Sequence, residues 1–364
     1  MTHTTKVSRL TRRSAFWLWA VFCLLGALMG ILTLTPYVLV FFGGAVVGAL
    51  VLIPVLLAGL WYFRRLHPVR PHPWSHALLI TAWGLFAVPG VALIANEAFG
   101  GILTQMAGLS FADRWGAAIS APIVEETLKL AGVALLALMV PQAIRGPLDG
   151  FAYGALAGFG FEIAENYLYV FNTIVAHGAV HSTVSVLDSL IGRVGTIWWG
   201  HWAMGAVAGA GLGYLVGATG RPLARRLLVA VGAFVLAMAM HAWWDFPLLA
   251  GGTWVWARGP AILVIAVVVY RVARRRYLDR FRDAAAAEAD RGVLTAAETE
   301  ILTDRRRRRR ERRRTPGGTP RRLLTDLRSA ELDLIDTDLN DPGASADLRT
   351  DVGDLRSRLE ATRR

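Results

Sequence analysis

Glutamates, histidines and one lysine occur inside stretches of sequence that are otherwise apolar. They are Glu125, Glu126 and Lys129 in one stretch, Glu165 and Asn166 in the next, and His201 and His241 in two later ones. A charged side chain near the centre of a bilayer is energetically expensive, so such residues are candidates for function. Carboxylates and imidazoles together can activate water and protonate a leaving amine, which hydrolysis of a peptide bond requires.

The spacing of these residues indicates pairs on one helix face. Lys129 follows Glu126 by three residues and Glu125 by four, so it can hold one of the two glutamates ionised. A coupled pair of this kind suits proton transfer. Asn166 can orient a neighbouring carboxylate or the scissile carbonyl. Asp245 follows His241 by four residues and could orient its imidazole.

The elements that must position these residues are predicted to be membrane-spanning helices. Of the sequence, 54% is hydrophobic, and the mean hydropathy is +0.43. Several apolar runs reach the length of about 18–20 residues that crosses a bilayer, and their lack of alternation favours helices over strands. The sequence thus predicts an all-α, polytopic transmembrane bundle of about eight spans. The predicted spans are 14–35, 37–62, 75–98, 115–141, 148–174, 194–219, 226–247 and 255–274.

Basic residues in alternate connections predict the topology. The connections after the second, fourth, sixth and eighth spans contain Arg64 and Arg65, Arg145, Arg225, and Arg274 to Arg276, respectively. The other connections are poor in arginine and lysine. By the positive-inside rule both termini are then cytoplasmic, in a multi-pass protein of the cell membrane. The first span is interpreted as a retained helix and not as a signal peptide.

This topology places the candidate residues at similar depths. At a rise of about 1.5 Å per residue, the depths below the outer face are about 16 Å for Glu126, about 13 Å for Glu165, and about 10 and 9 Å for His201 and His241. Four antiparallel spans therefore place ionisable groups in one layer of the outer half of the bilayer.

The chain divides into three predicted parts: 1–74 with the first two spans, 75–276 as a catalytic membrane domain, and 277–364 as a cytoplasmic tail. The tail is expected to be largely disordered or to form short helices over 321–340 and 347–362, and it contains an arginine run over 305–314. We expect these arginines to bind anionic lipids, and we expect no nucleic acid partner. The single cysteine, Cys23, excludes an intrachain disulfide.

Two chemistries and two other functions stay open at this point. The set Glu126, Glu165, His201 and His241 could hold Zn²⁺, or the glutamates and histidines could activate water without a metal. The sequence contains no HExxH motif. The main alternative to an enzyme is a proton- or ion-coupled transporter, because buried carboxylates and histidines also form proton relays. The other alternative function is a membrane scaffold, in which the polar cluster is purely structural.

The sequence resembles the PrsW family of intramembrane metalloproteases, which is related to the CAAX-prenyl endopeptidases. The resemblance covers about residues 75–250. It rests on Glu125-Glu126-x-x-Lys129, on Phe161-x-x-x-Glu165-Asn166 after Asp149-Gly150, on His201 after Arg193, and on His241-x-x-x-Asp245.

The resemblance implies a peptidase, either metal-dependent or of the glutamate type. Its implied substrate is a membrane-tethered protein cut near the outer leaflet, such as an anti-sigma factor or another single-pass regulator. The implied catalytic residues are Glu125, Glu126, Lys129, Glu165, Asn166, His201 and His241. The arginine-rich tail lies outside the family pattern.

Overall fold

The computed structural model describes residues 13–177, 182–249, 254–339 and 345–362. Every regular element in these ranges is a helix, as the sequence predicts. The chain forms two compact units: one contains the residues up to Leu66 together with His72–Tyr270, and the other contains His67–Pro71 and the residues from Arg271 onward.

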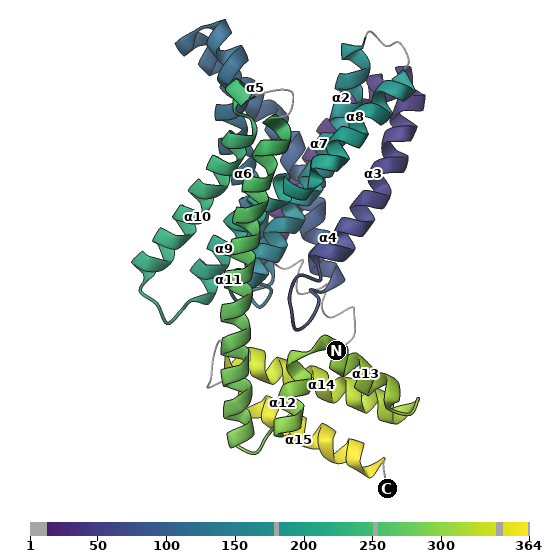
Figure 1. Ribbon diagram of the computed structural model, residues 1–364, viewed down its shortest axis with the longest axis vertical. Coiled ribbons are helices and arrows are strands. Elements are labelled where there is room, and N and C mark those ends of the chain that lie inside the picture. The colour runs from purple at the N-terminus through teal and green to yellow at the C-terminus, as the bar shows by residue number, and fades with distance from the viewer. Residues whose placement is uncertain (1–12, 178–181, 250–253, 340–344, 363–364) are drawn as a thin grey trace. The chain divides into compact units, whose positions relative to one another are not determined.

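The first unit is a bundle of long helices (Figure 1). In chain order its helices are α2 (Ser14–Val40), α3 (Phe42–Phe63), α4 (Trp74–Ala82), α5 (Val88–Ala107), α6 (Leu109–Met139), α7 (Pro147–Ala176), α8 (Ser182–Thr196), α9 (His201–Gly217) and α10 (Leu223–Trp244). The π-helical turn η1 (Trp83–Ala87) joins α4 to α5, and the short helices η2 (Ile197–Trp199) and η3 (Pro247–Leu249) follow α8 and α10. Helix α11 (Trp254–Asp290) begins in this unit and continues into the second.

Five helices of the described chain are long and apolar enough to cross a membrane. They are Ser14–Val40, Phe42–Phe63, Trp74–Ala107, Leu223–Trp244 and Trp256–Asp290. The three other predicted spans correspond to α6, α7 and α9. Helix α6 contains Glu125, Glu126 and Lys129, α7 contains two glutamates, and α9 has only 17 residues. The chain is therefore a membrane protein, and the count of eight spans stays a prediction.

The first two predicted spans meet at a different residue from the one expected. The predicted boundary is Pro36, but Pro36 lies inside α2 and the break is at Phe41. A proline is tolerated within a membrane helix because neighbouring groups can satisfy the freed backbone carbonyl. Proline alone is therefore a weak marker of a helix end in this chain.

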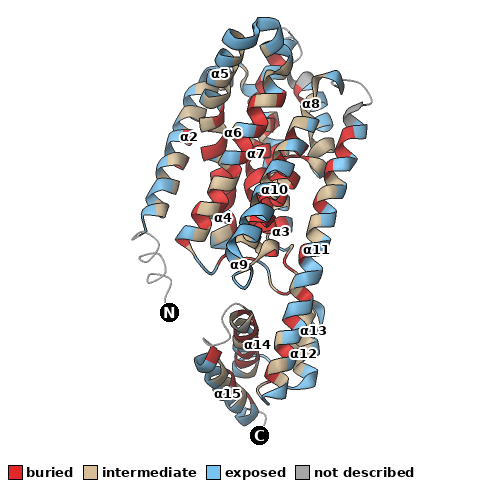
Figure 2. Ribbon diagram, turned by 90° about the vertical axis from the view of Figure 1, so that its left-hand side faces the viewer, coloured by how far each residue is buried: buried red, intermediate tan, exposed pale blue. Residues whose placement is uncertain are grey.

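Helix α7 forms the centre of the first unit and packs closely on α9. Figure 2 shows α7 buried, whereas α2 and α10 expose much of their surface. Glycines spaced four residues apart line the contact on both helices. They are Gly150, Gly154 and Gly158 on α7, and Gly205, Gly209 and Gly213 on α9. Such small residues let two membrane helices approach until their backbones touch, which fixes the position of His201 at the start of α9.

We expect Gly154→Ala to destabilise the bundle. A Cβ atom at Gly154 would lie 2.0 Å from the backbone oxygen of Gly205, so the two helices would have to separate. Overpacking of this kind costs about 1–3 kcal/mol. Thermal unfolding of the purified protein should show a lowered midpoint. The matched control is Gly232→Ala on α10, where an added Cβ meets nothing within 4 Å. Equal midpoints for the two variants would contradict this packing.

The second unit is also helical. Besides the end of α11 it contains α12 (Ala296–Thr303), α13 (Arg305–Arg314), α14 (Thr319–Asp338) and α15 (Ala346–Ala361). Apolar residues of α11, α12 and α14 form one buried cluster, and apolar residues of α14 and α15 form another. Helices α14 and α15 lie close to the two predicted ranges. Helices α12 and α13 lie where a largely disordered tail was expected, and the arginine run is a helix capped by Asp304.

A network of charges joins the helices of this unit. The guanidinium of Arg328 contacts Glu311 at 2.7 Å, Glu331 at 2.7 Å and Glu298 at 3.2 Å. Arg356 also contacts Glu298, at 2.9 Å. Burial raises the pKa of Glu331 to about 7 although Arg328 lies beside it. Glu331 therefore contributes its full negative charge to the network only above neutral pH.

Candidate active site

Helix α6 contributes three buried charged side chains on one face. Glu125, Glu126 and Lys129 are at most 6% exposed. The ammonium of Lys129 donates a hydrogen bond to Oε1 of Glu126 at 2.7 Å and lies 3.7 Å from Oε2 of Glu125. It also lies 4.4 Å from the centre of the Phe161 ring. The lysine therefore compensates the charge of the adjacent carboxylates, as the spacing in the sequence predicts.

Helix α10 brings His241 against the same carboxylates. Its Nδ1 lies 2.8 Å from Oε1 of Glu126. Its Nε2 lies 3.3 Å from Asp245 and 3.8 Å from Oε2 of Glu125. Both ring nitrogens thus face carboxylate oxygens, and Asp245 lies where the i,i+4 spacing places it. His241 joins the end of α10 to the centre of α6.

His201 is the first residue of α9 and links α6 to α7. Its Nδ1 lies 2.9 Å from the ammonium of Lys129, and its Nε2 lies 3.1 Å from Oε2 of Glu165. An ammonium can only donate, so Nδ1 accepts from Lys129 and Nε2 donates to Glu165. A continuous chain of hydrogen bonds therefore runs from His241 through Glu126, Lys129 and His201 to Glu165.

Arg193 on α8 binds the residues of α7 at which this series of hydrogen bonds ends. Its Nη2 donates to Oε2 of Glu165 at 3.0 Å, and its Nε donates to Oδ1 of Asn166 at 2.5 Å. The same guanidinium lies over the ring of Tyr169 at 3.6 Å. Arg193 thus fixes two neighbouring candidate residues at once.

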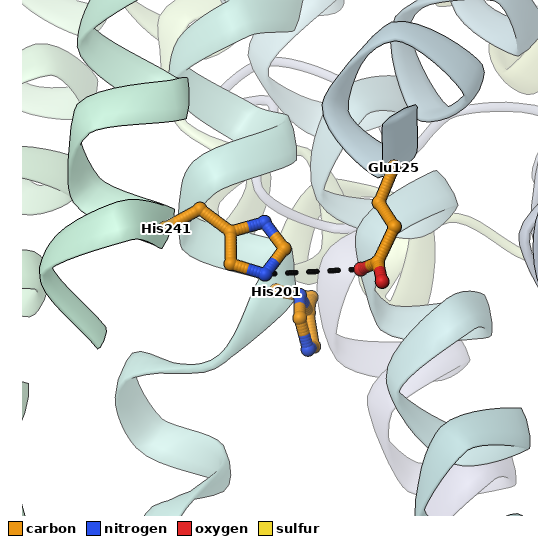
Figure 3. Close-up of side chains that lie close together, drawn as sticks. All are labelled: Glu125, His201 and His241. Carbon is orange, nitrogen blue, oxygen red and sulfur yellow. Dashed lines mark ion pairs between the residues drawn. The ribbon is translucent and has the colours of Figure 1, made fainter. Parts of the chain in front are cut away.

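All seven candidate residues that the sequence predicts come together in one connected cluster. Figure 3 shows Glu125, His201 and His241 converging from separate elements. One member was not found from the sequence: Asn96 on α5 donates from Nδ2 to Oε1 of Glu125 at 3.2 Å. The sequence feature that could have indicated Asn96 is its position beside Glu97 near the end of an apolar run.

The cluster contains a group of side chains that could hold a metal ion. One ligand atom each from Glu125, His201 and His241 lies within 4.8 Å of the other two. A glutamate and two histidines are a donor set that zinc accepts in catalytic sites. Oε2 of Glu125 is buried and makes no hydrogen bond, so it is free to be a ligand. The three side chains therefore fit a metal, which would take the place of one contact that each histidine ring makes in the structure.

This group differs from the metal set expected from the sequence. The expected set was Glu126, Glu165, His201 and His241. In the structure Oε1 of Glu126 is hydrogen-bonded to Lys129 and His241, and Oε2 of Glu165 is bonded to Arg193 and His201. Among the described residues, Glu125 is the glutamate that groups with both histidines, with all three ligand atoms within 4.8 Å of one another. The geometry thus favours Glu125 as the glutamate ligand beside His201 and His241.

We expect Arg193→Ala to reduce activity without unfolding the bundle. Without the guanidinium, Glu165 and Asn166 lose their common donor and their orientation. Loss of such a supporting contact typically lowers activity by about 10–100-fold. The cleavage rate of purified protein measures the effect, with the exposed Arg114→Ala on α6 as control. A wild-type rate for Arg193→Ala would show that Arg193 does not position these residues.

Comparison with known proteins identifies the family. Residues 72–273, more than half of the chain, match the family model described as PrsW family intramembrane metalloprotease. This match contains every residue of the cluster. No curated protein and no solved structure matches the chain. The chain therefore belongs to the PrsW family of intramembrane metalloproteases.

Proposed function

We propose that this peptidase cleaves a membrane-tethered protein near the outer leaflet, such as a single-pass regulator of the anti-sigma factor type. Membership of the family implies an intramembrane peptidase and hence a membrane protein as substrate. The observation that carries the proposal is the buried chain of hydrogen bonds from His241 to Glu165. It joins two carboxylates and two imidazoles, the groups that hydrolysis of a peptide bond needs.

In the proposed mechanism one carboxylate of the pair Glu126 and Glu165 takes one proton from the attacking water as its oxygen bonds to the scissile carbon. His201, hydrogen-bonded to Glu165, relays that proton to the nitrogen of the leaving amine, so that the carbon–nitrogen bond can break. Lys129 keeps Glu126 ionised and supplies positive charge toward the developing oxyanion. Arg193 orients Glu165 and holds Asn166 beside it. His241, held by Asp245, orients Glu126.

A metal would add one contribution to this mechanism. A zinc ion held by Glu125, His201 and His241 would act as a Lewis acid toward the scissile carbonyl. The carboxylates Glu126 and Glu165, which lie outside that group, would keep their role in proton transfer, and His201 would hold the metal in place of relaying the proton. Whether the peptidase is of the metallo or the glutamate type is decided by the metal content of the purified, active protein.

The proposed topology has eight spans with both termini in the cytoplasm. Alternate basic connections support it, and so do the five helices that are long and apolar enough to span a membrane. With this topology the layer that contains Glu126, Glu165, His201 and His241 lies in the outer half of the bilayer. The exposed arginines of α13 are proposed to bind anionic lipid headgroups.

The proposal is tested by reconstituting the purified protein in vesicles with a panel of single-pass membrane proteins. Mass spectrometry of new peptide termini should find cuts within or next to the apolar segment of at least one of them. Proton or ion flux across the vesicle wall, with no new termini in any panel member, would instead select a transporter.

A further inference from the structure

A cavity of about 300 Å³ lies beside the active site, between α2, α5 and α7. Its walls include Leu34 of α2 and Leu93 of α5, and both Glu125 and Glu165 lie on its lining. The volume is at the lower end of the range of about 300–1,000 Å³ that is typical of ligand sites. The cavity therefore gives a route from the side of the bundle to two carboxylates of the cluster.

The way α2 and α5 cross explains why the cavity exists. The two helices touch at Gly26 and Gly90, where a Cβ added at Gly90 would lie 2.4 Å from the Cα of Gly26. Two straight helices that touch at one crossing diverge on either side of it. Leu34 and Leu93 lie beyond the crossing on their respective helices, so the cavity fills the space where α2 and α5 separate.

The surface around the cavity is apolar. Helix α2 is exposed along most of its length, with leucines such as Leu28 and Leu32 at 49% and 62% exposed. Leu93 and Tyr169, on the cavity walls, are themselves 38% and 39% exposed. One end is bounded by the rings of Tyr37 and Phe171, whose centres are 5.8 Å apart. In a membrane protein such a surface faces lipid, so the cavity is reached from the bilayer.

Polar side chains lie on each wall of this apolar cavity. Asn96 points its Nδ2 to Glu125, and its buried Oδ1 makes no hydrogen bond within the described chain. Thr33, Tyr37 and Asn172 also line the cavity. An unpaired backbone amide is costly in lipid, so a peptide that unwinds there needs such partners. A helical peptide, whose amides are bonded internally, does not.

We propose that this cavity binds the substrate as an extended, apolar stretch of peptide that enters between α2 and α5 from the bilayer. Its apolar side chains pack on Leu34 and Leu93, and its freed backbone amides bond to Asn96 and the other polar groups. The scissile carbonyl then lies next to Glu125 and Glu165. The proposal rests on the proposed peptidase function, and it makes Asn96 a residue that recognises substrate backbone.

Photocrosslinking tests the location without requiring turnover. Benzoylphenylalanine is placed at Leu34, which lines the cavity, or at Leu32, an exposed residue on the same helix, in inactive Glu126→Gln protein reconstituted in vesicles. The probes are two tagged synthetic single-span peptides of leucine and alanine, one with a central Gly-Asn-Gly break and one unbroken. We expect the broken peptide to crosslink to the probe at position 34. The probe at position 32 should give little of this product, and so should the unbroken peptide with the probe at position 34. Equal yields at the two positions would overturn the proposal.

A second pair of variants tests the cavity in the active protein. Leu93→Trp fills the cavity, and Ile94→Trp places the same ring on the neighbouring exposed position. We expect Leu93→Trp to lower the cleavage rate on the order of 100-fold, as for a substrate displaced from the reacting groups, and Ile94→Trp to retain the rate. Retained cleavage in Leu93→Trp would reject the cavity but leave the peptidase standing. Crosslinking at position 34 without any cleavage by wild type would reject the peptidase but leave a peptide-binding site.

Discussion

Glu126→Gln protein is expected to fold normally and to lose cleavage activity by about 10²–10⁴-fold. Glutamine has the shape of glutamate, but it cannot take a proton from water. Glu126 is fully buried and accepts hydrogen bonds from Lys129 at 2.7 Å and from His241 at 2.8 Å. The amide oxygen can keep these two bonds, and Glu125, 3.7 Å from the ammonium, still compensates the charge of Lys129. The loss should therefore appear in the rate of the chemical step more than in stability. Single-turnover cleavage in vesicles measures it.

The matched control is Glu97→Gln on α5. Glu97 is exposed, and its replacement changes the same charge outside the cluster. Glu165→Gln and His201→Ala should lose cleavage activity as Glu126→Gln does, because each removes a group that the proposed proton transfer uses. A Glu126→Gln variant that cleaves at the wild-type rate would remove Glu126 from the mechanism.

Lys129→Met should affect both stability and activity. Lys129 is 1% exposed, and its ammonium is the positive charge nearest to Glu126. Removing one partner of a buried ion pair leaves the other charge uncompensated, at a cost of about 3–5 kcal/mol. The variant should therefore show a much lower midpoint of thermal unfolding and no cleavage. Both are measured on the same purified sample.

The double variant Lys129→Met with Glu126→Gln separates the charge from the packing. It removes both members of the closest pair, so part of the lost stability should return while activity stays absent. The return is partial because Glu125, 3.7 Å from the ammonium in the structure, also loses its compensating charge. If Lys129→Met were as stable as wild type, the ammonium would not be holding the glutamates as the distances indicate.

The members of the buried polar cluster could be predicted because burial of charge in a membrane segment is rare. Glu126, Glu165, His201 and His241 each stood out against apolar neighbours, and their estimated depths placed them in one layer. The structure brings these four side chains within one network. Helix periodicity also anticipated the Lys129–Glu126 and His241–Asp245 pairs, because both depend only on spacing along one helix.

Contacts between helices could not be predicted in the same way. The rotation of each helix about its own axis decides whether Glu125 or Glu126 faces the two histidine rings, and the sequence does not give that rotation. The role of Asn96 depends on how α5 packs against α6, and an uncharged amide gives no strong signal in an apolar run. The glycines of α7 and α9 could have indicated a close contact, but they do not name the partner helix.

The end of the first helix and the structure of the tail depended on context as well. Pro36 is a helix breaker in most soluble proteins, yet it lies within α2. The arginine run over 305–314 has strong self-repulsion as an isolated segment. In the structure Asp304 caps its first turn, and Glu311 pairs with Arg328 of α14.

The most direct test of the central claim is cleavage of a single-pass substrate in vesicles with water labelled with heavy oxygen. If the cluster activates water, the wild-type protein should produce a fragment whose new carboxyl group contains one labelled oxygen. Glu126→Gln protein should produce none under the same conditions. Labelled fragment formed equally by the two proteins, or an intact substrate with wild-type protein that conducts protons, would contradict the account.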